Sequence, residues 1–244
     1  MFILSKALVI IPTYNESDNI VKVLHSTLEQ EEPFHVLVVD DNSPDGTAQK
    51  VEEMQAHFPD RLFLMKRPGK SGLGTAYIAG FKWGLERDYQ YIFEMDADFS
   101  HNPLDLPDML KVVRSGEADV CIGSRYVGGG KVKNWPFLRL FLSYGASVYT
   151  RMILWMPVKD PTAGFICYHR KVLESLDLNN VKFIGYAFQI EMKYKAMKKG
   201  FRLREIPITF SDRIEGSSKM SKAIVREAIF GVIKLRWLKL RGKL

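Results

Sequence analysis

Two aspartates separated by one residue, Asp96 and Asp98, are the first candidates for chemistry in this 244-residue chain. They stand at the end of the apolar run 91–96 and precede a helix that we expect to open at Pro103. Two carboxylates at a strand end can approach one divalent cation, and hard oxygen ligands suit Mg²⁺ or Mn²⁺. The alternative is a pair of solvated turn acids, because this spacing is common. The buried strand before the aspartates keeps the metal interpretation open.

A second acidic pair, Asp40-Asp41, ends the apolar run 35–40. A carboxylate at such a position can accept hydrogen bonds from a nucleobase or a ribose hydroxyl. The alternative is an Asx turn that leads into Pro44-Asp45-Gly46, a strong turn signal. The two interpretations are compatible, since Asp45 is the better placed turn residue.

Four cationic residues, Arg125, Arg139, Arg213 and Lys219, are candidates for binding a phosphate. Arg139 and Ser143 lie four residues apart in an expected helix and therefore share a face. A phosphate monoester near apolar surface requires several charge-assisted donors, and arginine binds it with bidentate geometry. Each of these residues taken alone could instead be an ordinary surface cation.

The elements that must position these side chains alternate between short apolar strands and helical patterns. This alternation predicts an α/β fold with a Rossmann-like, doubly wound, mostly parallel sheet. In such sheets ligands bind beyond the carboxyl ends of the strands, where the polar runs 12–16, 40–43, 96–98 and 124–126 fall. Strands are expected at 7–12, 35–40, 61–66, 91–96 and 119–123, and helices at 15–29, from about 45, at 74–87 and at 104–114.

After Gly128-Gly129-Gly130, a predicted hinge, the pattern changes to an amphipathic helix over 137–154. A strand near 164–168, a helix over 188–199, a strand over 202–206 and a basic tail helix follow. We therefore expect one α/β domain over 1–218, which would hold the candidate residues for chemistry, and a basic amphipathic helix over 219–244.

Residues 220–244 carry six of the seven excess positive charges, and they mix them with apolar residues and Trp237. This mixture is typical of helices that lie in a membrane interface, whereas a partly packed, solvated helix is the alternative. For the helix over 137–154 the alternative is packing against the core. No uncharged apolar stretch reaches the roughly 20 residues of a spanning helix. The absence of a recognition motif argues against nucleic-acid binding despite the basic charge.

Several runs together resemble a known family: IPTYNE (11–16), VVDDNSPDGT (38–47), GLGTAYIAGF (72–81), MDADFSHNP (95–103) and GSRY (123–126). They are similar to family-2 glycosyltransferases of the GT-A fold. The later runs DPTAGF (160–165), GYAFQIEM (185–192) and DRIEGSSKMS (212–221) are similar to those of polyprenyl- or dolichyl-phosphate mannosyltransferases. The resemblance spans residues 6–222 in order.

The resemblance implies inverting transfer of mannose from GDP-mannose to a polyprenyl (dolichyl-type) monophosphate, with Mg²⁺ or Mn²⁺ as cofactor. Catalytic roles are implied for Asp98, Arg125 and Arg213. Asp96 and Asp98 would hold the metal; some members add a glutamine where Ser100 stands here, which leaves Ser100 or a water as the third ligand. Lipid-phosphate binding is implied for Arg125, Arg139, Ser143 and Arg213. Nucleotide-sugar binding is implied for Pro12, Tyr14, Glu16, Val39, Asp40, Asp41, Asp96, Ala97, Asp98 and Lys219.

Two alternatives remain open at this point. One is the same chemistry with UDP-glucose or another nucleotide-sugar, and the other is a nucleotide-binding protein without catalysis. A hydroxyl acceptor would need a catalytic base, for which Glu191 is the reserve candidate. The expected location is the cytoplasmic face of a membrane, bound peripherally through the chain's own surface or through a membrane anchor subunit.

Overall fold

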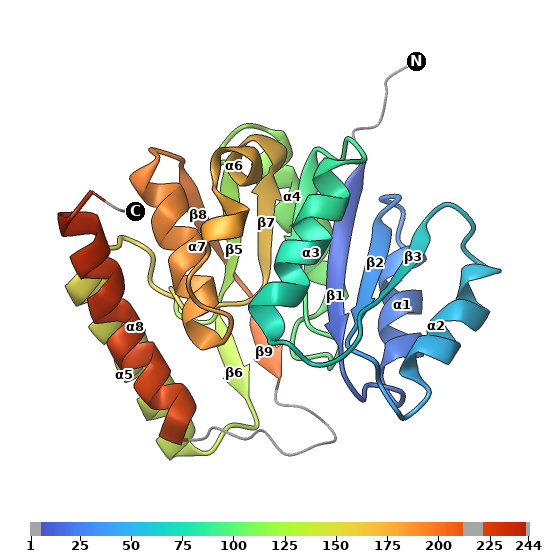
Figure 1. Ribbon diagram of the computed structural model, residues 1–244, viewed down its shortest axis with the longest axis horizontal. Coiled ribbons are helices and arrows are strands. Elements are labelled where there is room, and N and C mark those ends of the chain that lie inside the picture. Colours follow the sequence, from blue (N-terminus) through green and yellow to red (C-terminus); the bar gives the residue numbers. More distant parts are fainter. Residues whose placement is uncertain (1–5, 212–221, 243–244) are drawn as a thin grey trace.

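The computed structural model describes residues 6–211 and 222–242. A seven-stranded sheet in the order β3-β2-β1-β4-β7-β5-β8 forms its centre (Figure 1), and only β7 runs antiparallel to its neighbours. The prediction of a mostly parallel α/β sheet is thus confirmed. The strands are β1 (Ala7–Thr13), β2 (His35–Asp40), β3 (Leu62–Lys66), β4 (Tyr91–Glu94), β5 (Val120–Ser124), β7 (Ile166–His169) and β8 (Leu203–Pro207), and a separate two-stranded sheet pairs β6 (Lys131–Lys133) with β9 (Thr209–Ser211).

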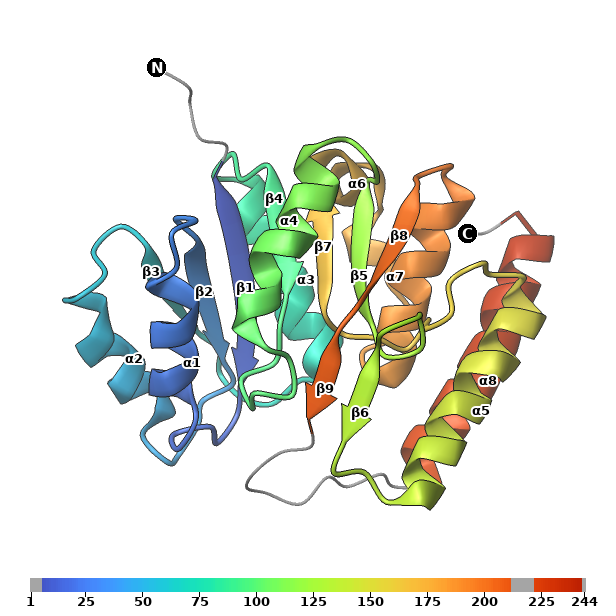
Figure 2. The same ribbon diagram turned by 180° about the vertical axis from the view of Figure 1, so that it is seen from behind.

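Helices cover both faces of the sheet, as Figures 1 and 2 show from opposite sides. One face carries α1 (Ile20–Leu28), α2 (Thr47–Gln55) and α4 (Leu106–Arg114), which follows the short 3₁₀ helix Pro103–Asp105. The other carries α3 (Leu73–Leu85), α6 (Arg170–Ser175) and α7 (Tyr186–Lys198), with the 3₁₀ helix Leu178–Asn180 between the last two. Each face has its own apolar core, so the inner strands β1, β2, β4 and β5 are buried on both sides and show no polar alternation.

The strand register aligns the residues that follow the central strands. Pro12 pairs with Val39 and Thr13 with Asp40, so the loops after β1 and β2 start at the same level. β4 is in register with β1, and the bond from Met95 N to Ile10 O continues that pairing for one residue past the strand. The carboxyl ends of these parallel strands lie at the lower edge of Figure 1.

The helix expected over 15–29 begins only at Ile20, so its predicted start is wrong. Asn15 has a left-handed backbone with φ 61°, which a helix cannot contain. The main-chain N–H groups of Asn15, Glu16 and Ser17 instead donate to side chains of the loop after β2. Sequence patterns also missed β6, β9 and α6, because segments of three to six residues carry little periodic signal.

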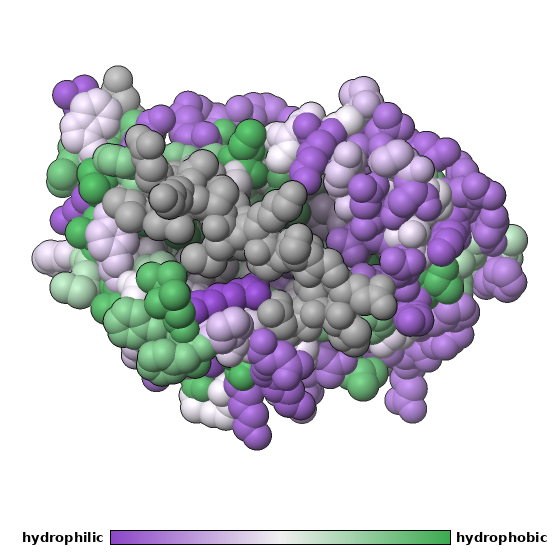
Figure 3. All heavy atoms as spheres, turned by 90° about the horizontal axis from the view of Figure 1, so that it is seen from below, coloured by the Kyte–Doolittle hydropathy of each residue, from purple (hydrophilic) through white to green (hydrophobic). Residues whose placement is uncertain are grey.

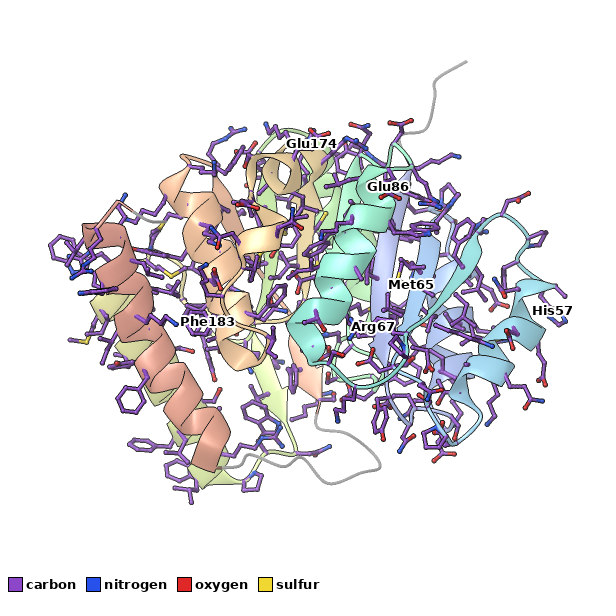
Figure 4. All side chains as sticks on the ribbon, in the orientation of Figure 1. His57, Met65, Arg67, Glu86, Glu174 and Phe183 are labelled. Carbon is purple, nitrogen blue, oxygen red and sulfur yellow. The ribbon has the colours of Figure 1, made fainter. Side chains whose placement is uncertain are left out.

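Two long helices, α5 (Phe137–Leu154) and α8 (Lys222–Leu240), lie side by side at one end of the molecule (Figures 1 and 2). The inner face of α8 buries Val232, Leu235 and Leu238. Phe183 packs between α7 and α8 (Figure 4), where a Cβ on Gly231 would stand 3.2 Å from its ring. The basic tail is therefore a partly packed helix, and no helix in the described ranges is long and apolar enough to span a membrane.

Candidate functional site

The loops after β1 and β2 are locked together by short polar side chains. Asp45 accepts hydrogen bonds from Ser17 N at 3.0 Å and from the Thr47 hydroxyl at 2.6 Å. Thr47 and Ser43 accept in turn from the main chain of the first loop. The first loop, which includes Tyr14 and Glu16, therefore has a fixed shape before any ligand arrives.

Asp40 and Asp41 are adjacent in the sequence, but their side chains have different partners. Asp40 is buried and accepts from the hydroxyls of Thr13 (2.8 Å) and Ser43 (2.6 Å) and from Ser43 N. Asp40 therefore fixes the start of the loop after β2, whereas the Asx turn is formed by Asp45, whose Oδ1 accepts from Thr47 N at 3.0 Å. Asp41 contacts Arg67 instead, with 2.8 Å between Oδ1 and Nε.

Arg67 anchors the loop between β3 and α3 to this end of the sheet (Figure 4). Its Nη2 also donates to the Thr75 hydroxyl at 2.9 Å, and its main-chain N–H donates to Asp40 O. Lys70 of the same loop lies over the exposed ring of Tyr14, with Nζ 4.6 Å from the ring centroid. The loop between β3 and α3 thus spans from Asp41 to Tyr14 and puts cationic groups beside both.

Asp96 and Asp98 follow β4 at the same edge. Tyr77 donates its hydroxyl to Asp96 Oδ1 at 3.3 Å, and Ser100 N donates to Asp98 Oδ1 at 3.0 Å. Asp98 is buried, whereas about a third of the Asp96 side chain is exposed. The hydroxyl of Ser100 is buried and has no hydrogen-bond partner within the described part of the chain. A buried oxygen in this state next to two carboxylates suits a hard cation.

His101 connects the acidic pair to the cationic side of the site. Its Nδ1 accepts from Asp96 N at 3.2 Å, so the proton of the neutral ring sits on Nε2. Burial lowers the pKa of His101, against the opposing charges of Asp96 and Asp98. The ring stacks on Phe165 at 4.9 Å and meets Phe210 edge-on at 5.6 Å.

Arg125 follows β5 and forms a bidentate ion pair with the buried Asp160, with two N–O distances of 2.7 Å. Asp160 also accepts from Arg125 N, and the Thr162 hydroxyl accepts from Nη2 at 2.8 Å. Burial alone would raise the pKa of Asp160, but the adjacent guanidinium lowers it below its ordinary value. The sequence analysis includes Asp160 in the run 160–165 but assigns it no role. The feature that could have identified it is an isolated aspartate directly before a proline.

The guanidinium groups of Arg125 and Arg139 both lie over Trp135, at 5.6 and 4.2 Å from its ring. Tyr126 donates its hydroxyl to Ser143 at 2.8 Å. Arg125 also lies over the Tyr126 ring at 5.2 Å, so contacts with Trp135 and Tyr126 link it to Arg139 and Ser143, the other two described members of the predicted lipid-phosphate set. Phe210 contacts both Arg125, at 5.5 Å, and His101, so the acidic pair and the arginines belong to one site. Arg213 and Lys219, the remaining predicted cations, lie outside the described residues.

Some predicted residues present no side chain to this edge. Val39 and Ala97 are buried in the two apolar cores, so their side chains cannot bind a ligand. Glu191, the reserve base, is fully buried; it accepts from Lys182 N and Phe183 N and pairs with Lys195 at 2.6 Å. The structure thus assigns Glu191 to holding the segment before α7.

Large apolar side chains are exposed along α5 and α8. Figure 3, viewed toward the site edge, shows hydrophobic residues gathered at the left, where Figure 1 places these helices. We call them the apolar surface of α5 and α8. It comprises Phe137, Leu138, Phe141, Leu142, Met152 and the following Trp155, together with Phe230, Ile233, Trp237 and Leu240.

Comparison with known proteins gives a consistent result. Residues 8–177 match the family described as Glycosyl transferase family 2. The chain is 48% identical over 239 residues to polyprenol monophosphomannose synthase of Mycolicibacterium smegmatis, covering 98% of this chain and 89% of that protein. It is 44% identical over 243 residues to undecaprenyl-phosphate mannosyltransferase of Micrococcus luteus, covering 98% and 99%.

A solved structure of glucosyl-3-phosphoglycerate synthase from Mycobacterium tuberculosis, in complex with Mn²⁺, UDP and phosphoglyceric acid, has a similar fold. The TM-score is 0.71, and the alignment covers 95% of this chain and 78% of that one. At 15% sequence identity this likeness concerns the fold alone.

Proposed function

The chain belongs to glycosyl transferase family 2 and is a glycosyltransferase of the GT-A fold, and we propose that it transfers mannose from GDP-mannose to a polyprenyl monophosphate. The products would be polyprenyl-phosphate β-mannose and GDP. One observation carries the proposal: the Asp96–Asp98 pair and the Arg125–Asp160 pair meet around His101 and Phe210. The names of the two relatives given above refer to polyprenol monophosphomannose and to undecaprenyl phosphate, which supports this class of acceptor.

On the donor side, we assign the base and ribose to the edge formed by Tyr14, Glu16 and Asp41. Asp41 is held by Arg67, so its carboxylate has a fixed orientation. Lys70 is near enough to Tyr14 to meet a negative charge that enters beside the ring. The identity of the base as guanine is inferred from the family resemblance.

We assign a divalent cation to Asp96 and Asp98, with the buried Ser100 hydroxyl as the third protein oxygen. No cluster of three acidic, histidine or cysteine ligands occurs among the residues that the structure describes, so phosphate oxygens and water would complete the shell. When bound, such an ion stabilises the charge on the departing diphosphate. The protein's part is orientation, since Tyr77 and Ser100 N fix one oxygen of each carboxylate.

On the acceptor side, we assign the lipid phosphate to the group formed by Arg125, Arg139 and Ser143, with Arg213 as a further member. A phosphate monoester is already ionised near neutral pH and can attack without losing a proton. The reaction therefore needs positioning rather than a general base. Asp160 is neutralised by Arg125, and Glu191 lies elsewhere, which fits this requirement. In-line attack from the acceptor side inverts the anomeric centre.

A donor panel tests the proposal. The purified chain is given polyprenyl phosphate in vesicles with Mn²⁺ and, separately, GDP-mannose, UDP-glucose, GDP-glucose or UDP-mannose. We expect GDP-mannose to give at least tenfold more glycolipid than each of the other donors. A preference for UDP-glucose would replace the donor in this account, and release of nucleotide without glycolipid would reject the acceptor.

We further propose that the apolar surface of α5 and α8 lies in the membrane interface on the cytoplasmic side. Exposed aromatic residues there alternate with basic groups, including Arg236 over Trp155 and Arg241 over Trp237. This combination favours the headgroup region of an anionic bilayer. The surface also adjoins Arg139 and Ser143, so a lipid phosphate would reach the site without leaving the interface.

Binding to vesicles tests this orientation. Replacing Phe137 and Phe141 with glutamate removes two exposed rings, and we expect roughly a tenfold weaker binding to anionic vesicles. The matched control is Leu104→Glu, which changes a side chain of similar exposure beside α4. Equal losses for both variants, or no loss for the double variant, would place the contact surface elsewhere.

A further inference from the structure

A lysine lies fully buried behind the site. Lys193 of α7 has no exposed surface, which is rare for a lysine unless its charge is compensated. Its Nζ donates to Ala163 O at 2.6 Å. Neither the sequence motifs nor the proposed reaction accounts for it.

The charged groups that face Lys193 come from four separate segments of the chain. Glu94 at the end of β4 and Asp160 favour its charged form, Glu205 of β8 does so more weakly, and Arg125 opposes it. Burial still lowers the pKa of Lys193 and raises that of Glu94. Glu94 and Asp160 are both fully buried, so removing Lys193 leaves two buried carboxylates with Arg125 as the nearby cation.

The segment that Lys193 holds contacts both halves of the site. At the start of this segment, the Asp160 carboxylate pairs with Arg125. Ala163 N donates to Asp160 O at 3.2 Å and closes a turn. Phe165, two residues after the lysine's partner, stacks on His101. The backbone bond from Lys193 therefore fixes the strip of chain between the arginine and the acidic pair.

We propose that Lys193 is a positioning residue for the acceptor phosphate, acting through the Asp160–Ala163 segment on Arg125. It touches no substrate. Its loss lets the segment shift, and the guanidinium moves with Asp160. The Asp41–Arg67 contact lies outside that segment, so the part of the donor site assigned to the base and ribose keeps its geometry. The inference rests on the proposed function, since it assumes that Arg125 meets the lipid phosphate.

The test compares Lys193→Met with Lys195→Met, two residues further along α7. Lys195 pairs with Glu191 and donates to Asn180 O, away from Arg125. For Lys193→Met we expect the KM for polyprenyl phosphate to rise about tenfold or more, with the KM for GDP-mannose within twofold. For Lys195→Met we expect a lower melting temperature and neither KM changed.

Two results would overturn the inference: an unchanged acceptor KM in Lys193→Met, or equal rises in both KM values. If that variant does not fold, Glu94→Gln/Lys193→Met restores the buried charge balance and is compared with Glu94→Gln under the same criteria. A wild-type chain that forms no mannolipid rejects the proposed function, whereas an active wild type with an unaffected Lys193→Met rejects only this inference.

Discussion

We expect Asp98→Asn to lower kcat for mannosyl transfer by at least about 1,000-fold while the chain stays folded. Asn keeps the size of the side chain and an oxygen that can accept the bond from Ser100 N. It removes the negative charge that the proposed cation requires. Initial rates at saturating GDP-mannose and Mn²⁺ measure the effect, and thermal unfolding checks the fold.

The matched control is Asp108→Asn, an exposed acid in the first turn of α4 on the connection that follows the site. This control should keep the wild-type rate. A normal rate in Asp98→Asn would show that the carboxylate pair holds no catalytic metal. A loss of rate that merely parallels a loss of folded protein would leave Asp98 a structural role only.

Much of the fold could be predicted from the sequence, because buried parallel strands give continuous apolar runs such as 7–12 and 35–40. Those strands, and the polar residues that follow each of them, can be predicted from local sequence pattern alone. The helix over 137–154 was also predicted with its observed bounds. The strand that becomes β7 was predicted near 164–168, but its antiparallel place between β4 and β5 depends on a long-range pairing that no local pattern specifies.

The site was predictable where its residues sit at strand ends and unpredictable where contacts join distant loops. Asp96, Asp98 and Arg125 could be singled out as candidates because each follows an apolar strand. The partner of Arg125, Asp160, lies 35 residues away and reaches it only through the antiparallel return of β7. Likewise, the different tasks of Asp40 and Asp41 depend on Thr13 and Arg67, which the fold alone brings near.

Selectivity for an ionised acceptor is the second large effect that we expect. Arg125 and Arg139 both lie over Trp135, and Tyr126, which contacts Arg125, donates its hydroxyl to Ser143. We propose that these cationic groups bind the acceptor phosphate through charge-assisted hydrogen bonds, which a neutral alcohol cannot match. A free alcohol would also need a base to remove its proton. Asp160 pairs with Arg125, and its lowered pKa makes it a poor base.

A direct comparison of two acceptors of equal chain length, polyprenyl phosphate and the corresponding polyprenol, tests this central claim. Both are presented in identical vesicles with GDP-mannose and Mn²⁺, and initial rates of mannolipid formation are measured. The site described here predicts a rate with the phosphate at least about 1,000-fold above that with the alcohol. Comparable rates for the two acceptors would contradict it, because the arginines would then confer no preference for an anionic acceptor.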